Sequence, residues 1–101
     1  MSRKARDVAR ALTQKGFAEE KKRDHQYYFY YQNQKKTSVY TKISHGETDI
    51  GAALLSRMAR QVRLSKIEFD DLIDCPLDAP GYLSALIAKA VLQPDRDTNG
   101  S

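Results

Sequence analysis

The run Gln26-Tyr-Tyr-Phe-Tyr-Tyr31 constrains the fold of this chain more than any other segment. Aromatic side chains at this density favour a β-strand, where they pack on a pleated surface, over a helix. Because successive strand residues point to opposite faces, the run separates into two aromatic sets. The first set is Tyr28 and Tyr30, and the second is Tyr27, Phe29 and Tyr31, joined by His25 if the strand already includes that residue. The segment therefore predicts a strand with two distinct faces.

Two further strands are expected beside this one. A polar turn over residues 32–36 is followed by residues 37–43, Thr-Ser-Val-Tyr-Thr-Lys-Ile, which resume a β-prone alternation and complete a hairpin. A lone hairpin is marginally stable in water. We therefore expect residues 17 to about 23 to add a third antiparallel strand.

The sequence before these strands predicts a helix over residues 4–15. Its apolar residues recur at helical spacing, with most of the basic residues off that stripe. They are Ala5, Val8, Ala9 and Leu12. Gly16 then stands where a helix commonly needs a left-handed C-terminal residue, so the helix is expected to end there.

Two more helices are predicted after the strands. Thr48 is the expected cap of a helix that runs to about residue 63. Its apolar stripe consists of Ile50, Leu54, Leu55, Met58 and Val62. Ser65 and Glu68 then form a capping-box pattern, which begins a short helix to about residue 73 that Cys75-Pro76 ends.

A last helix is expected from Pro80 or Gly81 to Leu92. It presents Leu83, Leu86, Ile87, Ala90 and Val91 on one face. This face either packs on the domain or forms a dimer or partner surface. The chain thus divides into a folded unit over residues 1–73, a helical extension over 74–92 and a flexible tail over 93–101.

These elements predict an α+β fold of the order α-β-β-β-α with a helical extension. The two main helices cover one face of a three-stranded antiparallel sheet and leave the other face available for function. Double-stranded RNA-binding domains have this layout, although a layout alone implies no activity.

Composition excludes several classes of protein. A chain of 101 residues suits one modest hydrophobic core. Cys75 is its one cysteine, so no disulfide bond within the chain is possible, and without a nearby second Cys or His a zinc site is not expected. We expect no metal and no cofactor. There is no long apolar run and no signal-peptide pattern, so we expect a cytoplasmic protein without membrane contact.

The charges divide unevenly along the chain. Residues 1–66 hold 15 lysines and arginines against 6 aspartates and glutamates, a balance of +9, whereas residues 67–101 hold 2 and 7, a balance of −5. Clustered cations gain affinity for polyanions by releasing counterions from phosphates. The basic part therefore predicts binding to a polyanion, the alternative being a solvated surface. The acidic part is a candidate shield for the basic surface.

The histidines are the candidates for acid–base chemistry, since imidazole titrates near neutral pH. His25 stands at the mouth of the aromatic strand, after Lys21, Lys22 and Arg23. These cations are candidates to bind a phosphate while the imidazole removes a proton from an RNA 2′-hydroxyl, without a metal. The alternative is a surface histidine that begins a strand. His45 is a turn residue, a phosphate contact or the second member of an acid–base pair.

Two further groups of side chains are candidates for RNA contact. The aromatic set of Tyr27 is suited either to stacking unpaired bases or to forming a core or interface. Arg57 and Arg60 lie three residues apart on the second helix, with Arg63 three further on. Such a row either follows a phosphate backbone or is the solvated face of the helix.

The sequence resembles the HicA-type toxins, small mRNA interferases of bacterial toxin–antitoxin pairs. The stretch Lys4-Ala-Arg-Asp-Val-Ala-Arg-Ala-Leu-Thr-Gln-Lys-Gly-Phe17 is similar to the opening helix and Gly-Phe of that family. Lys22-Arg-Asp-His-Gln-Tyr-Tyr28 and Thr41-Lys-Ile-Ser-His45 resemble its two histidine-containing strand segments. Leu55-Ser-Arg-Met-Ala-Arg-Gln-Val-Arg-Leu-Ser65 aligns with its second helix, and the likeness covers roughly residues 4–73.

The resemblance implies a double-stranded-RNA-binding-like fold, an endoribonuclease activity on mRNA and inhibition by a HicB-type antitoxin. By position it implicates His25 as the catalytic residue. The chain departs from the family pattern where Arg23-Asp24 replaces Gly-Ser before the histidine and where Ser56 replaces a frequent arginine. The Asp24 carboxylate either orients the imidazole or marks a member that binds RNA without cleaving it.

Overall fold

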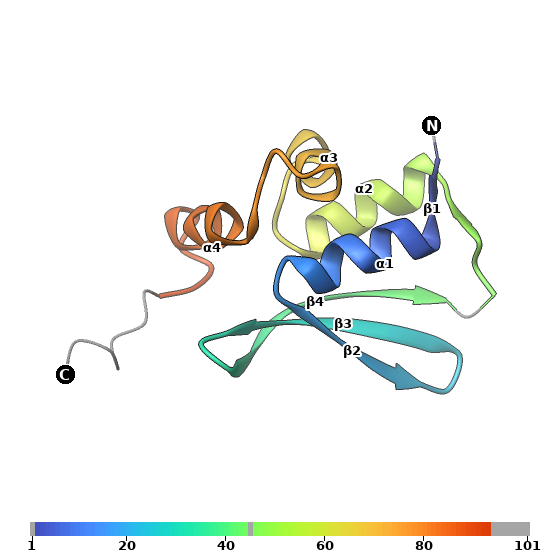
Figure 1. Ribbon diagram of the computed structural model, residues 1–101, viewed down its shortest axis with the longest axis horizontal. Helices are drawn as coiled ribbons and strands as arrows, with labels where there is room; N and C mark the ends of the chain where they lie inside the picture. The colour runs from blue at the N-terminus through green and yellow to red at the C-terminus, as the bar shows by residue number, and fades with distance from the viewer. Residues whose placement is uncertain (1, 45, 94–101) are drawn as a thin grey trace.

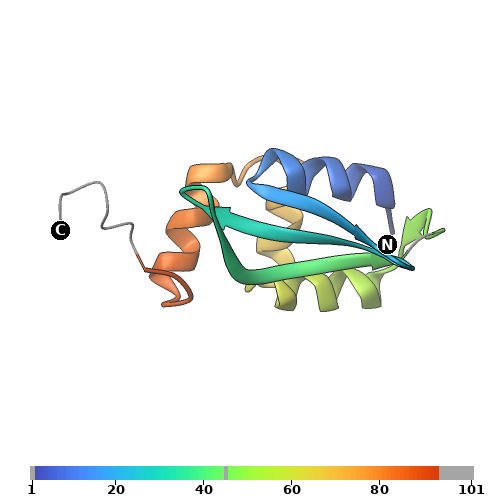
Figure 2. The same ribbon diagram turned by 90° about the horizontal axis from the view of Figure 1, so that it is seen from below.

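The chain is described here by a computed structural model that covers residues 2–44 and 46–93 (Figure 1). Its elements follow the order β1 (Arg3–Lys4), α1 (Ala5–Gln14), β2 (Phe17–Lys22), β3 (His25–Gln32), β4 (Lys35–Ser44), β5 (Asp49–Ile50), α2 (Ala52–Gln61), α3 (Lys66–Asp74) and α4 (Ala79–Ala88). The expected α+β class is confirmed, with a three-stranded antiparallel sheet in the order β2-β3-β4. Helices α1 and α2 lie on one face of this sheet, and the other face is open toward the viewer in Figure 2.

The predicted separation of the aromatic strand into two faces is confirmed. Tyr28 and Tyr30 are 1% and 4% exposed and belong to the hydrophobic core between the sheet and the helices. His25 is the first residue of β3 and pairs with Lys22 on β2 and Ser44 on β4. It therefore shares the open face with Tyr27 and Phe29.

The β3–β4 hairpin is longer than the sequence predicts. The five polar residues 32–36 suggested a turn, but the strands continue through Gln32 and from Lys35. Asn33 and Gln34 alone reverse the chain, with φ angles of 52° and 68°. A two-residue turn with both residues in the left-handed region matches the twist of a hairpin and needs no further polar residues.

The prediction of where the second helix begins was wrong. Thr48 does not cap it: Gly51 is the N-cap, and α2 begins at Ala52. The residues before it form β5, in which Ile50 pairs with Arg3 of β1 and is fully buried. The first helix likewise begins one residue late, since Lys4 belongs to β1. In this two-stranded ribbon Ile50 is buried with an extended backbone conformation. A helix that began at Thr48 would not give Ile50 this conformation.

The end of α1 is fixed by two neighbouring residues. Gly16 has a φ of 108°, as the sequence predicted, and a Cβ built there would lie 2.8 Å from Cε1 of Tyr30. Lys15 is only 6% exposed, and its Nζ donates to the carbonyls of Leu72 and Leu77 at 2.6 and 2.7 Å. The ammonium satisfies a carbonyl in the last turn of α3, where a positive charge is favoured by the helix dipole.

Helix α3 begins as predicted. The Ser65 side chain accepts from the Glu68 amide, and the Glu68 carboxylate accepts from the Ser65 amide, which completes the capping box. The helix packs against both α1 and α2 on their side away from the sheet (Figure 1). Cys75, in the left-handed conformation, ends it.

Helix α4 packs on the domain, the first of the two alternatives for this segment. It is shorter than expected, because it ends at Ala88 and Ala90 adopts a left-handed φ of 62°. Tyr82, which the sequence pattern did not single out, is fully buried with Leu86 in the same core as the sheet. Leu83 and Val91 are partly buried and pack against that core. Of the segment predicted as a flexible tail, only residue 93 lies within the described residues.

Candidate nucleic-acid interface

The open face of the sheet carries an aromatic cluster, which we define as His25, Tyr27, Phe29 and Tyr40. Tyr27 and Phe29 are stacked with centroids 6.0 Å apart, and Tyr40, opposite Phe29 on β4, lies 5.2 Å from its ring. His25 extends the cluster, 6.2 Å from the ring of Tyr27. Tyr40 is 42% exposed, so the cluster is open to solvent at β4.

Three lysines lie over these rings. Lys36 Nζ is 3.9 Å from the centroid of Phe29, and Lys22 and Lys42 lie 5.7 and 5.9 Å from the centroid of Tyr27. A cation above an aromatic ring is attracted by the electrons of the ring face. The three ammonium groups therefore remain close to the aromatic rings and give this face a positive charge.

The open face carries one carboxylate among the described strand residues, that of Glu20. It accepts from Lys36 at 2.8 Å and lies 3.9 Å from Lys22. Its neighbour Glu19 points to the opposite face, where it accepts from the Tyr28 hydroxyl at 3.2 Å. Burial, with the nearby Glu19 charge, raises the pKa of Tyr28 to about 12.

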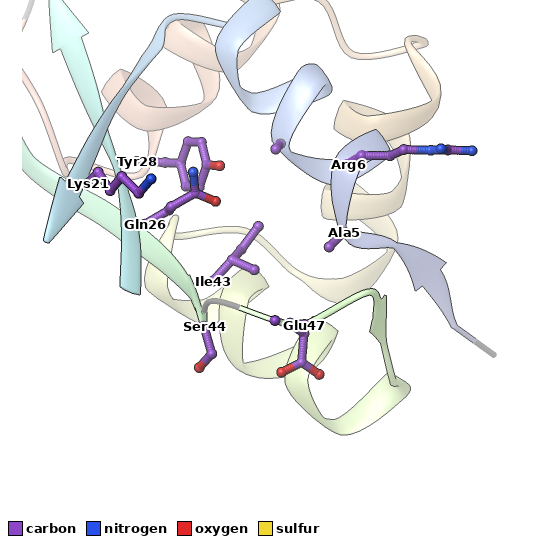
Figure 3. Close-up of a pocket in the computed structure, with 10 residues that line it drawn as sticks. Ala5, Arg6, Lys21, Gln26, Tyr28, Ile43, Ser44 and Glu47 are labelled. Carbon is purple, nitrogen blue, oxygen red and sulfur yellow. The ribbon is translucent and has the colours of Figure 1, made fainter. Parts of the chain in front are cut away.

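The structure separates the three cations predicted to bind phosphate beside His25. Lys22 lies on the face of His25, but Lys21 pairs with Gln26 and lies on the helical face. There it lines a hollow of about 360 Å³ between β2–β4 and the start of α1, whose lining also includes Arg6 and Tyr28 (Figure 3). Arg23 is exposed in the β2–β3 turn, with a φ of 46°. Alternation along β2 dictates this separation, since adjacent residues point to opposite faces.

Asp24 does not orient His25 in this structure. Asp24 is exposed in the same turn as Arg23. Within residues 2–44 and 46–93, the imidazole of His25 donates to no carboxylate, and its ring contact is Tyr27. The second candidate histidine, His45, lies outside the described residues.

The basic row of α2 borders the aromatic cluster. Arg57, Arg60 and Arg63 are exposed and, with Ser38, Tyr40 and Gln61, line a shallow hollow of about 290 Å³. No carboxylate in the described part of the chain forms an ion pair with these arginines. Because Tyr40 belongs to both surfaces, the row and the aromatic cluster form one continuous basic and aromatic surface. Sequence reasoning found Arg57 and Arg60 but missed Tyr40, Lys36 and Lys42.

The acidic side chains of α3 do not cover this surface. Asp74 and Asp70 pair with Arg3 at 2.8 and 3.2 Å, and Glu68 pairs with Lys89 at 2.7 Å. A hydrogen bond from Arg3 lowers the pKa of Asp74, and one from Lys89 lowers that of Glu68. Since α3 lies on the side of α1 and α2 away from the sheet, these carboxylates do not cover the open face (Figure 1). Asp95 and Asp97, which belong to the same acidic part, lie outside the described residues.

The described residues contain no group of three or more His, Cys, Asp or Glu side chains placed to hold a metal ion. No helix among them is both long and apolar enough to span a membrane. Comparisons of the chain with protein-family models, with curated proteins and with solved structures found no match.

Proposed function

We propose that this protein binds single-stranded RNA on the open face of its sheet and cleaves it without a metal, as an mRNA interferase of the HicA type with a double-stranded-RNA-binding-like fold. The observation that carries the proposal is the aromatic cluster, which begins with His25 and lies under Lys22, Lys36 and Lys42. Exposed aromatic rings stack on unpaired bases, whereas the bases of a duplex are already stacked on each other.

The same surface supplies contacts for the RNA backbone. The lysines over the rings would supply positive charge for the phosphates, and the row of Arg57, Arg60 and Arg63 continues past Tyr40. Arginine contacts phosphate with a planar fork of donors, and each neutralised phosphate releases counterions. An extended strand of RNA that crosses from β3 over β4 to α2 would use both groups.

His25 is the proposed catalytic residue, the general acid–base group of the reaction. The 2′-hydroxyl oxygen attacks the adjacent phosphorus as the bond to the 5′-oxygen breaks, and imidazole is able to exchange the protons at neutral pH. The products are a 2′,3′-cyclic phosphate and a 5′-hydroxyl, so no water and no cofactor is consumed. A HicB-like antitoxin is the proposed inhibitor, and covering the open face would block both binding and cleavage.

A binding protein without nuclease activity is the second candidate. The position of Asp24 favours it, because this carboxylate is exposed and does not hold the His25 ring. Such a protein would use the same aromatic and basic surface to bind RNA and would regulate it by occupancy.

Incubation of the protein with a mixed-sequence single-stranded RNA in excess EDTA distinguishes these functions. We expect scission that leaves cyclic phosphate ends. A shifted but intact RNA, with a steep dependence of affinity on salt, would instead establish the binding protein. If the RNA is neither cut nor bound, both candidates are excluded.

Stacking on the aromatic cluster predicts a specific effect of Tyr27→Ala. Loss of one stacked base costs about 1–3 kcal/mol, so affinity for single-stranded RNA should fall roughly 5- to 150-fold. Since the ring carries no charge, the slope of log affinity against log salt should not change. Tyr27→Phe is the matched control and should bind as the wild type does. Equal affinity of the alanine variant and the wild type would exclude Tyr27 from base contact.

A further inference from the structure

Cleavage through a 2′-hydroxyl needs two proton transfers at opposite sides of one phosphorus. A base takes the proton of the attacking hydroxyl, and an acid gives one to the leaving 5′-oxygen, with the two oxygens roughly in line. A single imidazole reaches one of these oxygens at a time. The open face therefore needs a second acid–base group besides His25, at a distance that leaves room for a phosphate.

Glu20 occupies such a position. In the β2–β3 register Glu20 pairs with Tyr27 and Lys22 pairs with His25, so Glu20 and His25 are diagonal neighbours on one face. Diagonal neighbours in an antiparallel sheet lie roughly 7–8 Å apart. Because both side chains rise from the same face, a phosphodiester group that lies above the sheet between them would be within hydrogen-bonding reach of both the carboxylate and the imidazole.

The cations around Glu20 fit a phosphate in that position. Lys22 is beside His25 in the register and 3.9 Å from Glu20, and Lys36 holds the carboxylate at 2.8 Å from the β4 side. The groups that face Glu20 are thus Lys22 on its own strand, His25 and Tyr27 on β3, and Lys36 on β4. Both lysines can neutralise the charge of a bound phosphate, which would otherwise be repelled by the carboxylate.

We propose that Glu20 is the second catalytic residue of the nuclease, a step that rests on the function proposed above. The Glu20 carboxylate takes the proton of the 2′-hydroxyl while the 2′-oxygen of the RNA forms the new bond to phosphorus. The bond from phosphorus to the 5′-oxygen breaks, and that oxygen receives the proton of the His25 imidazolium. Glu20 ends protonated and His25 neutral, and proton exchange with solvent restores both.

The proposal predicts opposite effects of Glu20→Gln on binding and on cleavage. The cleavage rate should fall about 10²- to 10⁴-fold, the usual contribution of a general base. Affinity for RNA should not fall and is expected to rise, because the substitution removes the negative charge from the binding face. A carboxylate that only positions Lys36 would give the reverse, since its loss would disturb binding.

The test measures single-turnover cleavage and RNA affinity of the wild type, Glu20→Gln and Glu20→Asp. Cleavage should be lost in Glu20→Gln and restored in part in Glu20→Asp, whose side chain is again a carboxylate able to accept a proton. Glu19→Gln is the matched control, since Glu19 is the adjacent carboxylate on the opposite face.

Each outcome separates the two proposals. If the wild type cleaves and Glu20→Gln cleaves equally well, Glu20 is excluded while the nuclease function stands, and the second group must be sought elsewhere, first at His45. If the wild type does not cleave at all, the nuclease function is excluded and the role of Glu20 with it.

Discussion

His25→Ala is expected to abolish RNA cleavage and leave RNA binding largely intact. In the proposed mechanism the imidazole contributes one of the two proton transfers, so its removal should lower the cleavage rate by about 10²- to 10⁴-fold. The affinity should change little, because the stacked rings of Tyr27 and Phe29 and the lysines above them remain. The measurement is cleavage of single-stranded RNA in EDTA at saturating protein, with affinity determined in parallel on an uncleavable 2′-deoxy analogue.

The folded state of the variant is checked by circular dichroism and thermal unfolding. His25 is partly exposed at the start of β3, and its ring contacts only Tyr27 within the described residues, so the fold should be retained. The variant also reports contamination by another nuclease, since both proteins are purified in the same way. Cleavage retained by His25→Ala would remove His25 from the catalytic role.

Tyr82→Ala is expected to destabilise the whole domain, not α4 alone. The Tyr82 ring lies 5.6 Å from Phe17 and 5.1 Å from Tyr30, and its hydroxyl donates to the buried carbonyl of Val62 at 2.8 Å. This burial also raises the pKa of Tyr82. Truncation of a buried aromatic ring to alanine costs about 3–5 kcal/mol, which is a large part of the stability of a small domain. Urea unfolding followed by far-ultraviolet circular dichroism measures this loss.

Tyr82→Phe separates the ring from the hydroxyl. It keeps the aromatic contacts and leaves the Val62 carbonyl without its donor, so the free energy of unfolding should fall by about 1–3 kcal/mol. Tyr82→Ala should also unfold in one transition. If it instead loses only the helical signal of α4 while the rest unfolds as in the wild type, the segment after residue 74 is a separate appendage.

The sheet could be predicted from the sequence because strand alternation is a strong local signal. The run from His25 to Tyr31 indicated both faces correctly, and the same alternation, applied to residues 17–23, would have placed Lys21 and Lys22 on opposite faces. Across the hairpin, the sequence does not fix the register of Tyr40, because its position opposite Phe29 depends on an irregularity in the pairing. The bulge between Phe29 and Tyr31 shifts that register, and no local signal in the sequence reveals it.

The parts that the sequence did not predict depend on contacts between distant residues. The pairing of Arg3 with Ile50, which overrides the helix cap expected at Thr48, joins segments whose local patterns are unremarkable. The burial of Tyr82 was not predicted, because the helical spacing of the aliphatic residues indicated Leu83 and Ile87 as the buried face. Its burial depends on the space beside Phe17 and Tyr30, which only the assembled sheet creates.

The position of β2 at the outside of the sheet has a consequence for aggregation. An outer strand exposes unpaired backbone groups that another chain is able to join, and proteins commonly protect such strands with charged side chains. Residues 19–22, Glu-Glu-Lys-Lys, are all charged, and because they alternate between the faces of the sheet, β2 has two charged side chains on each face. A second copy of the chain that extended the sheet in parallel register would oppose each of these charges with its like. The residues that bring Glu20 and Lys22 to the open face of the sheet thus also disfavour fibrils in which β2 stacks on itself in register.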